Sequence, residues 1–276
     1  MHAIEVVARR TSAGFTLLEQ AVSLSVIALL LGSIMIPLQT QIENRKIDET
    51  KRMLEVAQEL LLGFAAAHGY LPCPATLSSA GQEPQGTDHI TGGCPVWHGF
   101  LPAALLGYRP VDAGGYALDA WEGTSNRIRY AVANTAVGGV TQALTRANGL
   151  RSVSLASFAA TPLYYICQSG SGTTANDCGS AVTLASNAAV VVWSAGPNAA
   201  TGGASAHEAQ NPSPSGGSAD RIFVSRGPSN VPGHEFDDIL AWIPATALVS
   251  RLVLAGQFPP AGPLPVSPPS GAGQPR

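Results

Sequence analysis

The hydrophobic pattern places a long apolar helix near the start of the chain. From Gln20 to Ile42 no residue carries a formal charge, and most residues are apolar. At about 1.5 Å rise per residue, a helix over 15–38 would be roughly 36 Å long. That length is enough to cross a hydrocarbon core of about 30 Å. The sequence therefore predicts a transmembrane helix at 15–38.

Residues 39–69 carry an amphipathic pattern that continues this helix. Largely apolar positions recur at alternating three- and four-residue steps, which places them on one helix face. These positions are Ile47, Thr50, Leu54, Ala57, Leu61, Phe64 and His68. Gly69 suits a left-handed helix end, and Pro72 prevents continuation. We expect the apolar face to pack on a protein core.

Beyond Gly69 the composition shifts towards glycine, proline, serine, threonine and β-forming residues. Strands are predicted at 128–132, 163–167, 188–194 and 221–225. A short helical turn is expected at 101–107 and a long loop at 196–219. We assign 70–256 to a globular α+β domain, and 257–276, rich in proline and glycine, to a disordered tail.

A basic leader meets the apolar helix at a glycine–phenylalanine junction. Arg9 and Arg10 precede Gly14 and Phe15, whereas an ordinary secretory signal is cut after its apolar stretch. Cleavage between Gly14 and Phe15 would leave the apolar segment on the mature protein. Because positive residues favour the cytoplasmic side, everything after the helix is expected on the other side of the membrane.

The run from Gly14 to Glu19, Gly-Phe-Thr-Leu-Leu-Glu, resembles the signature of type IV pilins and type II secretion pseudopilins. The resemblance implies that a prepilin peptidase removes residues 1–14 and that the new amino group of Phe15 is methylated. It further implies that mature subunits stack into a filament. The implied fold is pilin-like, with the long N-terminal helix packed on a small antiparallel β-sheet.

The same resemblance supplies expected partners and a location. The partners are other pilin-like subunits, the prepilin peptidase, an inner-membrane assembly platform, and membrane lipid before assembly. The chain is expected in the bacterial inner membrane, single-pass, with its C-terminal domain in the periplasm, and then in the pilus or pseudopilus. Segments 68–74, 99–102, 119–121 and 236–239 also look like pseudopilin sequences, although Glu122 stands where glycine usually follows the tryptophan. With 262 mature residues, 276 minus 14, a minor pilin or pseudopilin is favoured.

Glu19 is the single charged residue between Phe15 and Ile42. An ionised carboxylate in a membrane core costs at least about 2.5 to 3.5 kcal/mol on insertion scales, so it needs a partner or a proton. In the family that the chain resembles, this residue is thought to pair with the N-terminal ammonium of a neighbouring subunit, which here belongs to Phe15. The alternative is a carboxylate at the level of the lipid headgroups, one turn from the helix start.

Four cysteines follow the apolar helix, on the side expected to be oxidising: Cys73, Cys94, Cys167 and Cys178. An even number in such a compartment favours disulfides, and sequential pairing is the simplest of the three possible connectivities. The alternative is a zinc site made by Cys73, Cys94, His89 and His98, whose spacing lacks a paired Cys-x-x-Cys pattern.

An acidic cluster in a polar turn, Glu235, Asp237 and Asp238, suggests a calcium site. Some major pseudopilins have calcium sites. Calcium takes about six to eight oxygen ligands, so carbonyls, waters or Asp220 would have to complete the shell. The alternative is a helix N-cap at Asp237 or Asp238, ahead of a helix at 239–242.

The sequence lacks the motifs of common enzymes. No Gly-x-Ser-x-Gly, His-Glu-x-x-His or Gly-x-x-x-x-Gly-Lys occurs, and the pairs His207–Glu208 and His234–Glu235 are interpreted as solvated polar residues. With 15 basic and 18 acidic residues, no nucleic-acid binding is expected. The predicted function is a structural subunit of a type II secretion pseudopilus or type IV pilus, not an enzyme. The alternative is a membrane-tethered periplasmic binding module that does not polymerise.

Overall fold

The structure, a computed structural model, describes residues 16–201, 205–211 and 221–257 of the chain, without the side chains of 33–38. The chain divides into two compact units, Met1–Lys46 and Ile47–Arg276. Except for Gln257, the tail predicted at 257–276 lies outside the described residues.

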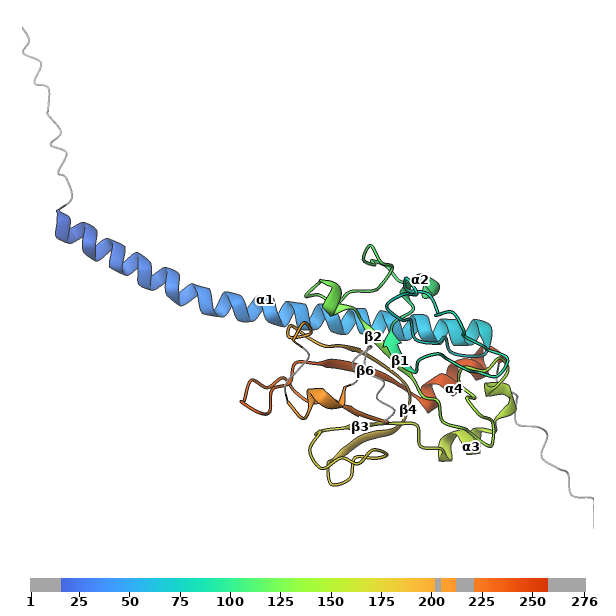
Figure 1. Ribbon diagram of the computed structural model, residues 1–276. Coiled ribbons are helices and arrows are strands. Elements are labelled where there is room, and N and C mark those ends of the chain that lie inside the picture. The colour runs from blue at the N-terminus through green and yellow to red at the C-terminus, as the bar shows by residue number, and fades with distance from the viewer. Residues whose placement is uncertain (1–15, 202–204, 212–220, 258–276) are drawn as a thin grey trace, which may run out of the picture. The chain divides into compact units, whose positions relative to one another are not determined.

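Helix α1 covers Leu17–His68 and is 52 residues long (Figure 1). Thr16 caps its first turn, because the Thr16 hydroxyl accepts a hydrogen bond from the Glu19 N–H at 3.2 Å. The helix ends where the sequence predicts: Gly69 adopts φ +79°, and its N–H donates to the Ala65 carbonyl at 2.8 Å. A left-handed glycine at this position is a common way to close an α-helix.

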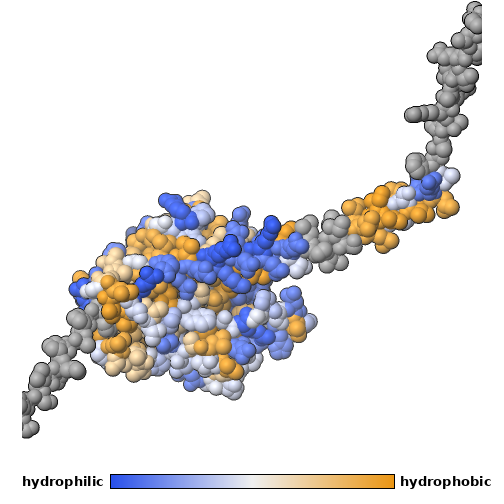
Figure 2. Space-filling model, turned by 180° about the vertical axis from the view of Figure 1, so that it is seen from behind, coloured by the Kyte–Doolittle hydropathy of each residue, from blue (hydrophilic) through white to orange (hydrophobic). Residues whose placement is uncertain are grey.

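In the first unit, residues 17–32 of α1 present an aliphatic surface (Figure 2). Its exposed large side chains are Leu17, Leu18, Val22, Leu24, Val26, Ile27, Leu29, Leu30 and Leu31. Within the described part of the chain, no helix combines the length and the apolar character needed to cross a membrane. This finding corrects the expected fold, which included a membrane-spanning half in this helix.

In the second unit, residues 47–68 of α1 bury one face in the main hydrophobic core. The fully buried positions of the predicted stripe are Thr50, Leu54, Ala57 and Leu61. The Gln58 side-chain amide donates to the Trp242 carbonyl at 2.8 Å, which joins the helix to the last strand. Of the other positions in that stripe, Ile47 and Phe64 are half-buried and His68 is exposed.

Six strands form one sheet around the long strand β4 (Figure 1). They are β1 (His98–Phe100), β2 (Arg129–Val132), β3 (Tyr164–Cys167), β4 (Thr183–Ser194), β5 (Ile222–Val224) and β6 (Ile239–Pro244). The order is β1-β2-β4-β3-β5, and β6 also pairs with β4. β2 and β6 run antiparallel to the second half of β4, and β3 runs antiparallel to its first half. β5 runs parallel to β3, so the sheet is mixed.

The expected pilin-like fold, with a small antiparallel sheet, is therefore wrong. The long connection after β4 gives the chain room to return alongside β3 in the parallel direction, which a short hairpin does not allow. Tyr165 thus faces Ile222, and Cys167 faces Val224. The four predicted strands correspond to β2, β3, β4 and β5. β1 and β6 were not predicted.

The described part of the second unit has three shorter α-helices: α2 (Ala103–Leu106), α3 (Leu155–Ala160) and α4 (Ala245–Leu254). It also has three 3-10 helices: η1 (Thr124–Asn126), η2 (Leu150–Ser152) and η3 (Glu208–Gln210). The helix considered at 239–242 is wrong, because these residues form β6 and pair with β4. Helix α4 begins directly after Pro244, whose ring disfavours continuation of the ladder and suits a helix start. Trp193, Tyr130 and Phe158 are the largest fully buried side chains in the core.

Candidate functional site

The processing junction at Gly14 and Phe15 lies outside the described residues. Glu19 lies in the first turn of α1 and is exposed. Its N–H is held by Thr16, and Thr16-Leu-Leu-Glu19 has the sequence of a capping box. The Glu19 carboxylate has no ion-pair or hydrogen-bond partner among the residues that the structure describes.

Two disulfides join the four cysteines in sequential order. Cys73 bonds to Cys94 with a Cα–Cα distance of 5.5 Å, and Cys167 bonds to Cys178 at 5.6 Å. His98, considered as a zinc ligand, is buried on β1, where its Nε2 lies 3.0 Å from the Tyr164 hydroxyl. Burial lowers the pKa of His98 to about 4. His98 therefore belongs to the core of the sheet and not to the surroundings of the first disulfide.

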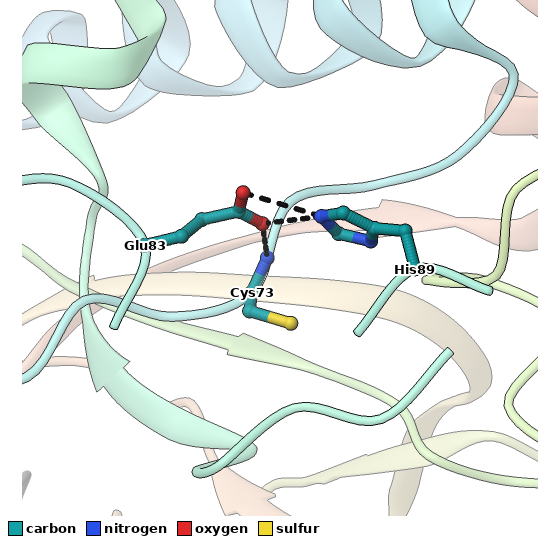
Figure 3. Close-up of side chains that lie close together, drawn as sticks. All are labelled: Cys73, Glu83 and His89. Atoms are coloured by element: carbon teal, nitrogen blue, oxygen red, sulfur yellow. Dashed lines mark hydrogen bonds and ion pairs between the residues drawn. The ribbon is translucent and has the colours of Figure 1, made fainter. Parts of the chain in front are cut away.

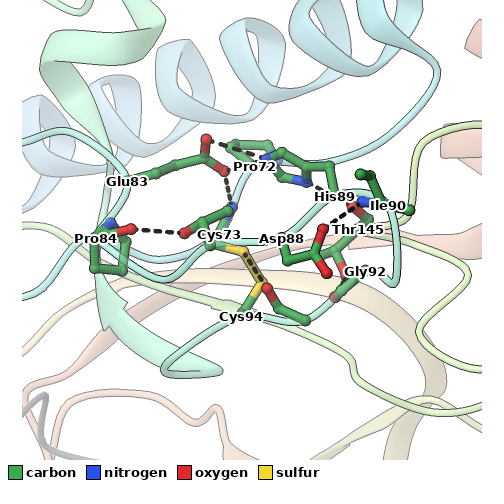
Figure 4. Close-up of polar contacts among 12 residues, drawn as sticks. Pro72, Cys73, Glu83, Pro84, Asp88, His89, Ile90, Gly92, Cys94 and Thr145 are labelled. Atoms are coloured by element: carbon green, nitrogen blue, oxygen red, sulfur yellow. Dashed lines mark hydrogen bonds and ion pairs between the residues drawn. A yellow bond between two sulfur atoms is a disulfide. The ribbon is translucent and has the colours of Figure 1, made fainter.

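Glu83 and His89 lie beside the Cys73–Cys94 disulfide (Figure 3, Figure 4). We call Cys73, Glu83 and His89 the Cys73 cluster. Glu83 accepts the Cys73 N–H at 2.6 Å through Oε1 and lies 3.0 Å from the His89 Nε2 through the same oxygen. The other ring nitrogen, His89 Nδ1, lies 2.7 Å from the Thr145 carbonyl oxygen. A carbonyl only accepts, so Nδ1 carries a proton.

The surroundings of His89 favour its charged form. Burial alone would lower the pKa of the ring, but hydrogen bonds to Glu83 and to the Thr145 carbonyl, with the attraction of Glu83, raise it above its usual value. The Tyr70 ring packs on His89 with centroids 4.2 Å apart. The result is a His89–Glu83 pair that is ionic when the ring is protonated; the two side chains are 20% and 19% exposed.

We expect His89→Gln to destabilise the protein more at pH 5 than at pH 9. The raised pKa means that the pair contributes fully below the unfolded pKa of about 6.5, and the contribution is lost as the pH rises through the folded value. The difference should be on the order of 1 kcal/mol, as for a partly exposed pair. Urea unfolding of both proteins across this range measures it. Glu83→Gln should remove the same pH dependence, and a difference that stays constant from pH 5 to 9 would contradict the assignment.

The predicted acidic cluster is only partly assembled. Asp237 and Asp238 lie just before β6, and Glu235 is half-buried as they are. The Glu235 carboxylate, however, is held by backbone N–H groups of its own turn, which lower its pKa. Glu208 takes its place: it comes from the loop between β4 and β5 and is 6% exposed. We call Glu208, Asp237 and Asp238 the acidic pocket. Asp220, considered as a further ligand, lies outside the described residues.

Hydrogen bonds fix the acidic pocket but leave oxygen atoms free. Glu208 Oε1 accepts the Asp237 N–H at 3.1 Å and the Asn198 side-chain amide at 3.2 Å. Asp238 Oδ2 accepts the Asn211 amide at 2.6 Å. Two buried oxygens, Glu208 Oε2 and Asp237 Oδ1, have no hydrogen-bond partner. A cavity of about 360 Å³ lies against this pocket.

Crowding of carboxylates sets the protonation of the acidic pocket. Burial, together with a hydrogen bond to and repulsion from Glu208, raises the pKa of Asp237 to about 7. Burial and repulsion from Glu208 raise the pKa of Asp238 to about 7, against the hydrogen bond from Asn211. Arg129, which lines the same cavity, is a nearby cation. The pocket therefore has more negative than positive charge. A proton or a bound cation would reduce the repulsion between its carboxylates.

The spacing of ligand atoms differs between the two sites. Among the residues described, only Cys73, Glu83 and His89 place three metal-binding atoms within 4.8 Å of one another. The acidic pocket does not meet that spacing, so its side chains would have to turn towards a calcium ion, which binds oxygen at about 2.3 to 2.6 Å.

The interpretation of His207 and Glu208 as solvated residues is wrong, whereas His234 of the second pair is exposed. His207 and Glu208 are 3% and 6% exposed. His207 Nδ1 accepts the Gly170 N–H at 3.0 Å, and its Nε2 lies 3.2 Å from the His234 Nδ1. Because the sequence places these residues in a loop of small residues, it gave no signal for their burial.

No protein-family model matches this chain, and neither a curated protein nor a solved structure has significant similarity to it.

Proposed function

We propose that this protein is a structural subunit of a filament, cut between Gly14 and Phe15 and assembled through the N-terminal part of α1. A minor subunit of a type II secretion pseudopilus is preferred to a subunit of a type IV pilus. The observation that supports this most directly is the aliphatic surface of residues 17–32, in which Glu19 is the single charge. The Gly14–Phe15 junction stands immediately before that surface.

An exposed surface of this kind needs apolar partners. Removing apolar area from water contributes about 25 cal/mol per Å², and one helix has no core of its own in which to bury it. Equivalent helices of other pilin-like subunits would supply the contacts in a filament, and lipid would supply them before assembly. The prepilin peptidase and an inner-membrane assembly platform are the further partners proposed.

The proposed location is the bacterial inner membrane and then the filament, with the second unit in the periplasm. Disulfides persist in oxidising compartments of this kind. Cys73–Cys94 and Cys167–Cys178 would each restrict the unfolded chain, which typically stabilises a fold by about 2 to 4 kcal/mol.

A second candidate, a tethered binding module that does not polymerise, is favoured by a polar cavity in the second unit. The cavity has a volume of about 740 Å³ and includes His207, Arg226 and His234 in its lining. Ligand pockets commonly measure about 300 to 1,000 Å³. Arg226 has no acidic partner among the described residues, so the cavity suits a small polar or anionic ligand.

Processing is the direct test of the filament proposal. When the chain is co-expressed with a prepilin peptidase, intact-mass analysis should show the loss of residues 1–14 and a methyl group on Phe15. Gly14→Leu should leave the full-length precursor. Gly32→Ala is the matched control, because a methyl group added there meets no atom within 4 Å. Assembled protein that retains Met1 would refute the proposal.

We further propose that the acidic pocket takes up a structural calcium ion. Support comes from the two buried, unpartnered carboxylate oxygens and from the shortage of positive charge around them. Asn198 and Asn211 would add amide or carbonyl oxygens to the three carboxylates. The ion would join the loop carrying Glu208 to the start of β6, and so stabilise the edge of the sheet.

A further inference from the structure

The Cys73 cluster has the ligand types and spacing of a zinc site, apart from its disulfide. Cys73 Sγ, a Glu83 carboxylate oxygen and a His89 ring nitrogen all lie within 4.8 Å of one another (Figure 3). The Cys94 sulfur is bonded to the Cys73 sulfur (Figure 4), although Cys94 is not itself part of the group within 4.8 Å. Two sulfurs, one imidazole nitrogen and one carboxylate oxygen are a four-ligand set that zinc accepts.

His89 is already oriented as metal-bound histidines are. Its Nδ1–H donates to the Thr145 carbonyl at 2.7 Å, which directs Nε2 towards Glu83 and the disulfide. In metal-binding histidines, the ring nitrogen that does not bind the metal commonly donates a hydrogen bond to a group such as a backbone carbonyl, which fixes the orientation of the ring. Tyr70 packs against the ring at 4.2 Å and Thr145 is fully buried, so the orientation is built into the fold.

The site is open to reagents from one side. Cys73 is fully buried, but Cys94, Glu83 and His89 are half-buried. A cavity of about 570 Å³ is lined by Glu83 and by Pro95, the neighbour of Cys94. A hydrated ion therefore has a path to the Glu83 carboxylate, and the half-buried Cys94 is the more exposed of the two disulfide sulfur residues.

We propose that reduction of the Cys73–Cys94 disulfide converts this cluster into a zinc site formed by Cys73, Cys94, Glu83 and His89. In the oxidised chain the two sulfurs form a disulfide and cannot bind zinc as thiolates, so only His89 and Glu83 remain as ligands. The inference does not depend on the filament proposal, because it concerns the chemistry of this loop alone.

The proposal has two chemical steps, reduction of the disulfide by a phosphine and binding of zinc to the resulting thiols. The phosphine takes an oxygen atom from water and becomes a phosphine oxide, its two electrons break the S–S bond, and the two water protons complete the two thiols. Zinc then displaces one proton from each thiol and the Nε2 proton of the His89 imidazolium, releasing three protons. Glu83 exchanges its hydrogen bond with His89 for a bond to the metal.

Cobalt(II) is the probe, because tetrahedral thiolate coordination gives it visible absorption bands. The protein is reduced with a water-soluble phosphine in the absence of air, titrated with cobalt(II), and then titrated with zinc. We expect one tetrahedral cobalt per reduced chain, displaced by one zinc, and no binding to the oxidised chain. Cys167→Ser/Cys178→Ser is the control and should keep the site, because it removes only the distant disulfide.

Variants of His89 and Glu83 test whether these two residues are zinc ligands. Loss of an outer-shell partner costs about 10- to 100-fold in metal affinity, so His89→Gln should weaken zinc binding by more than about 100-fold. Glu83→Gln, which keeps a carbonyl for the Cys73 N–H, should weaken it by at least about tenfold. Binding that is unchanged in both variants, or equal in the oxidised protein, overturns the proposal. A reduced chain that unfolds and fails to refold with zinc overturns it as well. Zinc that binds the site only in the folded chain would stabilise the folded state.

Discussion

Replacing Glu19 with glutamine should leave a stable, processed monomer that fails to enter the filament. In the proposed assembly, the Glu19 carboxylate meets the N-terminal ammonium of a neighbouring subunit in a poorly hydrated helix bundle. Removing one member of a buried ion pair costs about 3 to 5 kcal/mol, because the other charge remains buried without a counter-charge. Cross-linking of the variant to pilin-like partners should therefore be lost, while cleavage after Gly14 continues.

The N-terminal cap makes this substitution informative. Thr16 and Glu19 have the spacing of a capping box, and either glutamate or glutamine serves at its last position. Glu19→Gln thus removes the charge and keeps the helix start. Thr16→Ala is the matched control: it removes the hydroxyl cap, at a cost of about 1 kcal/mol, and keeps the charge. We expect Thr16→Ala to assemble.

The two variants together separate filament assembly from a tethered binding module. A module that never polymerises makes no contact through Glu19, so both variants should keep full function, and neither they nor the wild type should cross-link to pilin-like partners. Normal piliation or secretion in cells that carry Glu19→Gln would rule out the assembly role of the carboxylate. Failure of both variants would instead point to the helix start as the important feature.

Asp237→Asn should stabilise the calcium-free protein at pH 8 and abolish its response to calcium. Asp237 and Asp238 have folded pKa values of about 7, above the unfolded value of about 3.9. Between these values the native state binds more protons than the unfolded state, so the free energy of unfolding falls as the pH rises from about 4 to about 7. A neutral amide at 237 removes one of the three carboxylates that repel one another in the acidic pocket.

Thermal unfolding in the presence of a chelator measures the first effect. A gain of about 1 kcal/mol would raise the melting temperature by roughly 2 to 4 °C for a chain of this size. Calcium should raise the melting temperature of the wild-type protein. At a calcium concentration one hundred times the dissociation constant, binding would add about 2.7 kcal/mol to the free energy of unfolding. Glu235→Gln, in the exposed turn, should still respond to calcium.

The two parts of this prediction have different consequences. If calcium leaves the wild-type melting temperature unchanged, the calcium proposal is wrong. The predicted pH dependence of stability is unaffected, because it follows from the raised pKa values of Asp237 and Asp238 alone. If Asp237→Asn is less stable than the wild type at pH 8 in chelator, the repulsion between Glu208 and Asp237 is not what sets the stability of the pocket.

The helix and most strands could be predicted because their signals are local. The stripe containing Leu54, Ala57 and Leu61 repeats with the helix period, and Gly69 supplies the stop. β6 could not be predicted in the same way: Ile239–Pro244 is a short apolar run, and such runs fit a buried strand or a helix equally. Pairing with β4 decides between them, and that pairing is a property of the whole fold.

The sites depend even more on tertiary structure. Glu83 and His89 have no motif spacing to Cys73, and they meet because the disulfide loop folds back towards Thr145. Glu208 is 29 residues from Asp237 and lies in a loop of small residues, where a solvated side chain is the ordinary expectation. Neighbouring positions in the sequence favoured Glu235 as the third carboxylate. In the structure the Glu235 backbone carbonyl, not its carboxylate, contacts that loop, because it accepts a hydrogen bond from the Ser205 hydroxyl.

The central place of β4 also governs when the second unit can fold. β2 precedes β4 in the sequence, whereas β5 and β6 follow it. The sheet therefore stays incomplete until the last strand, Ile239–Pro244, has been synthesised. Contacts between residues so far apart in sequence form slowly, because loop closure precedes them. During synthesis the edge of β4 that later pairs with β6 remains available to other chains. A chaperone that covers unpaired strand edges would protect the newly made chain at this stage.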